Sequence, residues 1–508
     1  VHPVDMVFAV LGAAVPMYIV VFYQDLVSRA GTVNTLDFII GLIAVMLVIE
    51  AARRVVGWPM VTIALLFLAY ALLGPYIPGE LAHRGADLDT LVQHLFYTTE
   101  GIFGIPIGVS STFIFLFILF GAYLEKTGMG QFFIDIANAI AGWASGGPAK
   151  VAVLSSGLMG TVSGSSVANV VGTGSFTIPM MKKLGYKPEF AGAVEATAST
   201  GGQLMPPIMG AAAFLMAEFT QTPYVTIIAA AVIPALLYYF GVWTGVHLEA
   251  RRLGLRGLNR DELPKFKSLV VERGHLVIPL LAIIYLLVSG KTPMKAALYA
   301  IVLSIGVSML RKNTRIGLGD IIEGLEQGAR GVLGVLAATA CAGIIIGVVT
   351  MTGLGLKLGT TLVDLAHGNL LLTLFFTMIT SIILGMGVPT TANYVITSTI
   401  AAPALVLIGV PVLAAHMFAF YFGIIADVTP PVALAAFAGA GIAKGDPLRT
   451  GFNASKLAIA AFLVPYIFVY NPALLMINVH MGDIILIAIT SVIGIIGVSS
   501  GVAGFFLT

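Results

Sequence analysis

Two short runs of small and polar residues supply side-chain oxygens within an otherwise apolar sequence. They lie at residues 163–169 (Ser-Gly-Ser-Ser-Val-Ala-Asn) and at residues 387–393 (Gly-Val-Pro-Thr-Thr-Ala-Asn). Hydroxyl, amide and carbonyl oxygens without much negative charge suit Na⁺ better than a divalent transition metal. The two runs therefore predict cation sites built from neutral oxygens, and the same groups could hydrogen-bond an anionic substrate.

Each run is followed by a long apolar segment that a pair of prolines interrupts, at Pro206-Pro207 and at Pro430-Pro431. Proline lacks an amide hydrogen and clashes with the preceding helical turn, so consecutive prolines break a helix. A break at membrane depth frees backbone carbonyls, which need a partner such as a desolvated cation. It also creates half-helix N-termini, whose positive dipole ends attract an anion. We therefore expect a re-entrant hairpin followed by a broken helix in each half of the chain.

Asp427 is the single residue that points most directly to chemistry, because it lies in an apolar context just before the second break. Carboxylates inside a membrane are costly to bury and usually functional. Asp427 could bind a cation, relay a proton, or cap a half-helix that should begin near Thr429. Glu195, about two turns before the first break, is a second candidate acid, with a structural hydrogen bond as its alternative role.

These considerations divide the candidate residues into a substrate-binding set and an ion-binding set. The predicted substrate-binding residues are Ser165, Ser166, Asn169, Glu195, Gln203, Thr390, Thr391 and Asn393. The predicted ion-binding residues, several through their backbone carbonyls, are Ser163, Gly164, Gly201, Gly202, Gly385, Gly387, Asp427 and Thr429. The alternative for these positions is that small residues merely allow close helix packing and that the prolines are simple kinks.

The two runs and the two breaks belong to an internal repeat. Asn169 matches Asn393 at an offset of 224 residues (393 − 169), and the same offset aligns the two proline pairs. At this register Asp427 corresponds to Gln203, so the two ion sites are not expected to be equivalent. Lysines at 182–183 mark one loop as cytoplasmic, whereas the corresponding loop of the second copy has no Lys or Arg. This difference predicts that the second copy is inverted, as in many secondary transporters.

The composition is that of a membrane protein. Of 508 residues, 58% are hydrophobic and 10% are charged, whereas about 25% of the residues of a soluble domain are charged. Apolar runs of about 20 residues recur along the chain, and a helix of that length spans the ~30 Å hydrocarbon core. Because the runs are continuous rather than alternating, we predict an all-α polytopic membrane protein in contact with lipid.

Other classes of function are disfavoured by what the sequence carries. A net charge of +2 is too small to indicate nucleic-acid binding. The single cysteine, Cys341, provides neither a disulfide framework nor a cysteine metal cluster. The sequence shows no Ser/His/Asp set and no nucleotide-binding loop. We therefore predict a protein that is not an enzyme and needs no cofactor other than a coupling ion.

At these motifs the sequence resembles the large membrane subunit of the tripartite ATP-independent periplasmic (TRAP) transporters. The similarity covers about residues 100–470 and rests on residues 160–169, 178–186, 201–207, 385–393 and 427–431. The N-terminal part, with Glu50-Ala-Ala-Arg-Arg54, is similar to the version in which the small membrane subunit is fused ahead of the large one. This fused form is similar to the proteins of the TAXI branch of the family.

The resemblance implies a secondary active importer of a small organic acid, usually a carboxylate, in the bacterial inner membrane. It also implies a periplasmic substrate-binding protein as partner, Na⁺ as the coupling ion, and an elevator mechanism in which hairpins and broken helices move against a scaffold. From the residues themselves, H⁺ coupling through Glu195 and Asp427 stays open, and so does a passive anion channel.

The repeat, the loop charges and the resemblance together divide the chain into six regions. These are a small-subunit-like region with an amphipathic interfacial segment (1–100), the first inverted repeat (101–250), a cytoplasmic linker (251–274), scaffold helices (275–330), the second inverted repeat (331–470) and a C-terminal helix (471–508).

Overall fold

The computed structural model describes residues 3–477 and 480–505. Within these residues the chain is mostly helical and contains no strand. Ten of the described helices are long and apolar enough to cross a membrane. The prediction of an all-α polytopic membrane protein is therefore confirmed.

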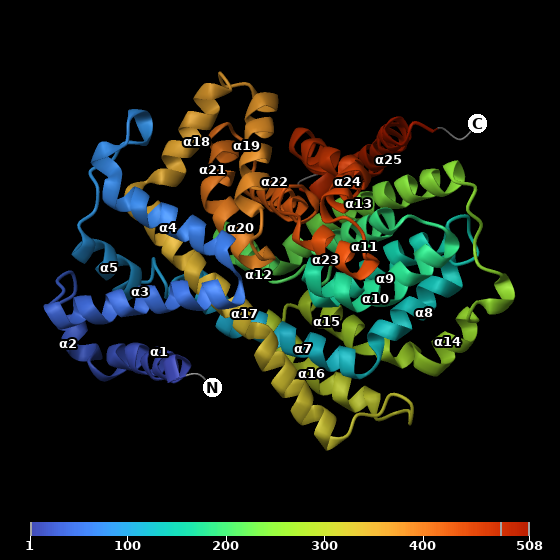
Figure 1. Ribbon diagram of the computed structural model, residues 1–508, viewed down its shortest axis with the longest axis horizontal. Coiled ribbons are helices and arrows are strands. Elements are labelled where there is room, and N and C mark those ends of the chain that lie inside the picture. The colour runs from blue at the N-terminus through green and yellow to red at the C-terminus, as the bar shows by residue number, and fades with distance from the viewer. Residues whose placement is uncertain (1–2, 478–479, 506–508) are drawn as a thin grey trace.

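The helices after residue 100 occur twice in the same order: a spanning helix, a short helix, a two-armed hairpin, a broken helix and a final long helix (Figure 1). The first copy consists of α7 (Phe115–Lys126), α8 (Met129–Ala141), α9 (Gly147–Ser163), α10 (Ser166–Leu184), α11 (Pro188–Gly202), α12 (Ala212–Thr220) and α13 (Tyr224–Arg252). The second consists of α17 (Leu318–Thr352), α18 (Leu354–Leu365), α19 (Leu370–Gly385), α20 (Thr390–Ile400), α21 (Ala402–Leu407), α22 (Val412–Ile425), α23 (Leu434–Ala443) and α24 (Pro447–Tyr470).

Both hairpins turn at a glycine with positive φ, a conformation that residues with a Cβ rarely adopt. Gly164 (φ 61°) separates α9 from α10, and Gly387 (φ 72°) precedes α20. Pro206-Pro207 lies between α11 and α12, and Pro430-Pro431 lies before α23. The predicted hairpins and breaks are therefore present. The second half-helix of the second copy begins at Leu434, later than expected.

The two copies pack against each other at their hairpins and breaks. Helix α10 of the first hairpin contacts α23, and α20 of the second hairpin contacts α12. Glycines allow the first hairpin to approach the first break closely, since a Cβ added to Gly202 would lie 2.7 Å from Gly160 Cα. Small residues therefore do serve close packing here, as the alternative interpretation proposed. The hairpin and break positions are held by backbone contact.

The N-terminal region packs mainly on the long helix α17. Helices α3 (Thr35–Val55), α4 (Trp58–Leu73) and α5 (Leu88–Tyr97) contact the long helix α17, and α1 (Pro3–Val21) contacts α3. The amphipathic interfacial segment expected within residues 1–100 corresponds to α5, whose apolar side is buried in protein. The remaining helices of the described chain are α2 (Tyr23–Ser28), α6 (Ile105–Val109), α14 (Phe266–Arg273), α15 (Ile278–Val288), α16 (Pro293–Ser308) and α25 (Met481–Ala503).

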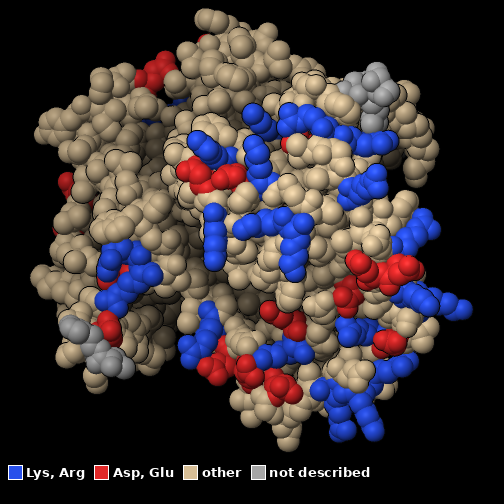
Figure 2. Space-filling model, turned by 45° about the vertical axis from the view of Figure 1, so that its right-hand side comes forward, with Lys and Arg blue, Asp and Glu red and all other residues tan. Residues whose placement is uncertain are grey.

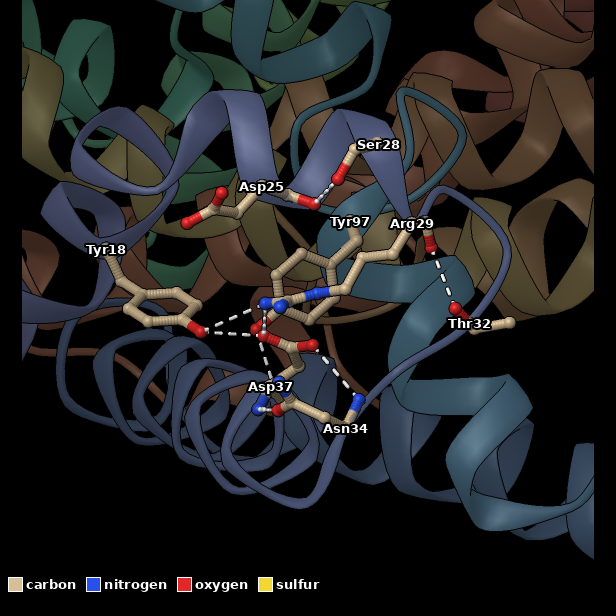
Figure 3. A network of polar contacts seen from close by, with 8 residues as sticks. All are labelled: Tyr18, Asp25, Ser28, Arg29, Thr32, Asn34, Asp37 and Tyr97. Carbon is tan, nitrogen blue, oxygen red and sulfur yellow. Dashed lines mark hydrogen bonds and ion pairs between the residues drawn. The ribbon is translucent and has the colours of Figure 1, made fainter.

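An ion pair between the partly exposed Arg29 and the buried Asp37 fixes the start of α3 (Figure 3). Asp37 Oδ1 accepts from Arg29 Nη2 at 2.8 Å and from the Tyr18 hydroxyl at 2.7 Å. Asn34 caps the helix through a reciprocal pair of bonds with Asp37. The Tyr97 hydroxyl donates to the Asp37 carbonyl at 2.8 Å. Because a buried charge is tolerated only when it is paired, this network holds α1, α3 and α5 together.

Lysine and arginine side chains gather on one face of the molecule (Figure 2). Exposed basic residues at the ends of α10 and α13 and in the following linker are Lys183, Lys187, Arg251, Arg252, Arg256, Arg260, Lys265 and Lys267. Cytoplasmic loops of membrane proteins are enriched in Lys and Arg. The face therefore has the composition that the predicted cytoplasmic loops require.

Candidate functional site

Four side chains from the two copies form one hydrogen-bonded chain, which we call the polar centre: Ser166, Asp427, Gln203 and Thr390. Ser166 Oγ donates to Asp427 Oδ2 at 2.6 Å, and Gln203 Nε2 donates to the same oxygen at 3.1 Å. Thr390 Oγ1 donates to Gln203 Oε1. The structure thus joins three predicted substrate-binding residues to the acid that we assigned to an ion. Gln203 and Asp427, equivalent by the repeat, contact each other directly.

The polar centre is positioned by the hairpin tips and the helix breaks. Ser166 is the first residue of α10, and Thr390 is the first residue of α20. Gln203 is the C-cap of α11, and Asp427 lies in the short 3-10 helix η6 (Ala426–Val428) between α22 and α23. The first amides of a helix have no partner within it and carry partial positive charge. Two helix N-termini therefore face a shared polar site where an anion would be stabilised.

Asp427 is almost completely buried, with 3% of its surface exposed, and none of the ion pairs of the described residues includes it. Its carboxylate accepts from two side chains rather than from the amides of a following helix. The capping role is therefore wrong, and the helix that it would have capped begins at Leu434. An ionised carboxylate without a cation is expensive at such a place, so Asp427 suits a site for a cation or a proton.

The two asparagines of the repeat lie beside the tips but have different partners. Asn169 Nδ2 donates to the Ser156 carbonyl at 2.8 Å, within the first hairpin. Asn393 Nδ2 donates to the Gly423 carbonyl at 2.6 Å, which ties the second hairpin to the second broken helix. Asn393 Oδ1 and Ser163 Oγ are buried and have no hydrogen-bond partner within the described chain. Each copy therefore offers an unpaired hard oxygen close to its tip.

Several backbone carbonyls expected to be free at the breaks are already in use. The carbonyls of Gly201 and Gly202 accept from the amides of Leu204 and Met205 at 3.0 and 3.1 Å, closing a turn. The Gly385 carbonyl likewise accepts from the Val388 amide at 3.3 Å. The expectation that the breaks leave these carbonyls unbonded is therefore wrong. Each retains one lone pair for an ion.

The other predicted residues have local roles in the structure. Ser165 caps α10, because its Oγ accepts from the Ala168 amide at 3.4 Å. Thr429 Oγ1 donates to the Ile425 carbonyl at 2.8 Å, within its own turn. Thr391 is buried beside Thr390. These residues shape the tips and the second break rather than extend the polar centre.

Glu195 lies outside the polar centre. It is fully buried, and its carboxylate contacts the hydroxyls of Ser156, Thr173, Thr177 and Ser199. None of the four was among the predicted residues. The i to i+4 spacing of Thr173 with Thr177 and of Glu195 with Ser199 was a usable signal, because such residues share one helix face.

An all-α membrane protein in which two repeats with broken helices meet at a buried polar site has the organisation of a secondary transporter. The sequence matches the family described as tripartite ATP-independent periplasmic transporter, DctM component, over residues 43–482. The chain belongs to this family. It is accordingly a multi-pass protein of the bacterial inner membrane.

Individual relatives agree with this assignment. The chain is 34% identical over 196 residues to the C4-dicarboxylate TRAP transporter large permease protein DctM of Pseudomonas aeruginosa, covering 38% of this chain and 45% of that protein. It is 23% identical over 488 residues to the isethionate TRAP transporter permease protein DctMQ of Oleidesulfovibrio alaskensis, covering 93% and 74% respectively. The chain spans about half the length, or less, of the first curated relatives that it matches.

Among solved structures, the chain is similar to the YdaH transporter of Alcanivorax borkumensis. The TM-score is 0.49 and the identity 17%, covering 88% of this chain and 96% of that one. A likeness at this level carries no functional assignment.

Proposed function

We propose that this chain is a permease that imports a small carboxylic acid, received from a periplasmic substrate-binding protein and driven by a Na⁺ gradient. The observation that carries the proposal is the polar centre, in which both hairpin tips and both breaks meet around Asp427. Relatives named as C4-dicarboxylate permeases support a carboxylate as cargo. Isethionate and sialic acid in the names of other relatives support an organic acid more generally.

The charge of the polar centre gives a physical reason for ion coupling. The helix N-termini of α10 and α20 favour an anionic substrate, but an ionised Asp427 would repel it. A cation beside the carboxylate removes this repulsion. The buried unpaired oxygens of Ser163 and Asn393 are hard donors of the kind that Na⁺ prefers. Substrate and Na⁺ would therefore bind together more readily than either alone.

We further propose that the first hairpin and first broken helix move together with those of the second copy, as in an elevator mechanism. The cross-packing of α10 with α23 and of α20 with α12 supports one moving body. The N-terminal helices α3, α4 and α5 pack on α17 instead. Residues 1–100 would then act as a fused small subunit of the TAXI type that stabilises the scaffold.

The test is uptake into proteoliposomes that contain this chain, with a periplasmic substrate-binding protein of the family added outside. Labelled succinate and malate are suitable probes, and Na⁺ and pH gradients are imposed separately. We expect saturable uptake that accumulates substrate when Na⁺ is higher outside. Flux that neither saturates nor exceeds equilibrium would show a passive anion channel and contradict the proposal. Uptake that a pH gradient drives and a Na⁺ gradient does not would replace Na⁺ by H⁺ as the coupling ion.

A further inference from the structure

Glu195 lies at the middle of a second buried cluster, which we call the hydroxyl cage: Glu195, Ser156, Thr173, Thr177 and Ser199. The carboxyl group is fully buried. The hydroxyls come from three elements, because Ser156 is on α9, Thr173 and Thr177 are on α10, and Ser199 is on α11. The cage therefore ties both arms of the first hairpin to the first broken helix.

The contacts within the cage accommodate a hydrogen atom on the carboxyl group, because a hydroxyl can either donate or accept. Ser156 Oγ lies 2.5 Å from Glu195 Oε1 and 2.9 Å from Thr173 Oγ1, and Thr173 Oγ1 also contacts Glu195 Oε1. The two hydroxyls can both donate to an ionised carboxylate, or one of them can accept from a protonated one. Thr173 Oγ1 is also 2.8 Å from the Asn169 carbonyl, a competing acceptor. Full burial without a counter-charge favours the protonated form, in which the carboxyl group can itself donate to a hydroxyl.

A metal ion does not fit the same contacts. Oxygens that coordinate a hard cation such as Ca²⁺ lie about 2.3–2.6 Å from the ion and are spread around it. In the cage, Ser156, Thr173 and Glu195 are instead at hydrogen-bond distance from one another. These contacts leave no space between the three oxygens for a cation larger than a proton.

No cation compensates a negative charge on Glu195, which forms none of the ion pairs of the described residues. Lys150 on α9 lies 3.0 Å from His247 Nδ1, and Lys182 on α10 donates to the Ala443 carbonyl at 2.7 Å. The Tyr239 hydroxyl on α13 donates to the Ala198 carbonyl at 2.7 Å. The other titratable residues of the elements packed on α11 are Lys183 on α10, Tyr224, Tyr238, Glu249, Arg251 and Arg252 on α13, Arg449, Lys456, Tyr466 and Tyr470 on α24, and Asp427 in η6; α23 has none.

The cage is a feature of the first copy alone. At the repeat offset of 224 residues, Glu195 corresponds to Ala419 and Thr177 to Ala401. Thr397, the counterpart of Thr173, bonds only within its own helix, to the carbonyls of Asn393 at 2.9 Å and Tyr394 at 3.3 Å. The second copy therefore has no acid at this position, and the cage is not required by the hairpin fold itself.

The cage is linked to the polar centre through two shared helices. Helix α11 carries Glu195 and ends at Gln203, and α10 carries Thr173 and begins at Ser166. A change in the spacing of α10 and α11 at the polar centre would therefore also change the cage. Opening the cage exposes the carboxyl group, and closing it favours the protonated form.

We propose that Glu195 binds a proton that exchanges during the transport cycle, so that a pH gradient contributes to uptake alongside Na⁺. The inference rests on the proposed function, to which it adds a second coupled ion and its site. In the binding step, the Glu195 carboxylate takes a proton from water on one side of the membrane and becomes a carboxylic acid. Release returns the proton to water on the other side, and no other bond changes.

The experiment measures uptake of labelled succinate in proteoliposomes, with the binding protein outside, by wild type, Glu195→Gln and Glu189→Gln. The amide that Glu195→Gln introduces can donate and accept hydrogen bonds as the protonated acid does, so the cage should remain closed. Glu189→Gln removes a partly exposed acid from the same helix and is the matched control. Each protein is assayed with a Na⁺ gradient at equal pH, and with a pH gradient at equal Na⁺.

With equal Na⁺ on both sides, an inward gradient of one pH unit should raise accumulation by wild type and by Glu189→Gln, up to about tenfold for one proton per substrate. Glu195→Gln should show no such rise while keeping its response to Na⁺. A wild type that responds to Na⁺ but not to pH, or a Glu195→Gln that still responds to pH, would overturn the inference and leave the proposed function standing. Uptake by wild type that neither a Na⁺ gradient nor a pH gradient raises would overturn both the inference and the proposed function.

Infrared spectroscopy tests the proton directly and does not depend on transport. The wild-type protein at neutral pH should show the carbonyl band of an un-ionised carboxylic acid that is missing from Glu195→Gln. Thr173→Val should keep this band, because the substitution removes a hydroxyl that donates to the carboxyl group, and losing a donor disfavours the carboxylate form. Identical spectra of wild type and Glu195→Gln in this region would show that Glu195 is ionised and would contradict the proposal.

Discussion

The two copies of the repeat have the same sequence of elements but differ in where they carry acid. The first copy has Gln203 at its break and encloses Glu195 in hydroxyls; the second has Asp427 at its break and Ala419 in place of the enclosed acid. Each copy therefore contributes one buried carboxyl group, at a different position in the repeat. The difference indicates that the duplication gives both copies the same helices. Substitutions at single positions then determine which copy carries a carboxyl group at each place.

The largest effect on uptake is expected at the breaks, where the first copy has Gln203 and the second has Asp427. Asp427→Asn keeps the size of the side chain but removes the charge that a cation would neutralise. Hydrogen bonds to charged groups contribute about 1.5–3 kcal/mol, so we expect uptake to fall roughly tenfold to a hundredfold. Asp446→Asn is the matched control, because Asp446 caps α24 by accepting from the Arg449 amide at 2.7 Å and Asn caps nearly as well. Equal uptake by the two variants would refute a charge role for Asp427.

Packing of the first hairpin on its break should be the next most sensitive feature. Gly160→Ala places a Cβ against the backbone of Gly202, whereas Gly172→Ala on the same hairpin meets nothing within 4 Å. Overpacking of this kind costs about 1–3 kcal/mol. We expect a lower midpoint of thermal unfolding in detergent for Gly160→Ala and little change for Gly172→Ala. Similar midpoints would show that the hairpin can move away from the break at low cost.

The two asparagines give a direct comparison between the copies. Asn393→Ala removes both an unpaired buried oxygen and the bond to the second broken helix, whereas Asn169→Ala removes a bond within one hairpin. We expect the Na⁺ concentration for half-maximal uptake to rise about tenfold for Asn393→Ala, equivalent to about 1.4 kcal/mol, and less for Asn169→Ala. Unchanged Na⁺ dependence in both would make the asparagines packing residues.

The smallest expected effects are those of replacing Thr173 and Thr397, two threonines at equivalent positions of the repeat. Thr173→Val leaves Glu195 short of a hydroxyl partner and should lower the free energy of unfolding by about 1–3 kcal/mol. Thr397→Val removes only bonds within its own helix and should cost less than about 0.5 kcal/mol. The measurement is thermal unfolding of both variants in the same detergent. Equal losses would contradict the view that the cage is confined to the first copy.

Much of the arrangement of helices could be predicted from the sequence, because the repeat contains prolines and glycines at the points where its helices end. The proline pairs and the glycines at the tips fix where helices stop. The apolar runs by themselves do not identify α8 and α18, because these helices carry polar residues such as Gln131, Asp135 and Asp364 among the apolar ones. Only a helical period of apolar residues, rather than a continuous run, indicates them.

The site was predictable as a set of residues but not as an arrangement. Register alone pairs Gln203 with Asp427, yet it does not say that they touch, because that contact depends on how one copy packs against the other. The hydroxyls around Glu195 come from three helices, and nothing in the sequence near each one sets it apart. Such contacts follow from tertiary packing, which local patterns do not encode.

The central claim is that residues of both copies form one transport site, and a double-mutant cycle tests it most directly. Gln203 belongs to the first break and Thr390 to the second hairpin, and the two side chains are hydrogen-bonded. Initial rates of Na⁺-driven succinate uptake would be measured for Gln203→Ala, Thr390→Ala and the double variant. Residues in contact show interaction energies of about 0.5–3 kcal/mol, so the double variant should lose little more than the worse single one. Losses that simply multiply would show that the two residues act independently and would contradict a shared site.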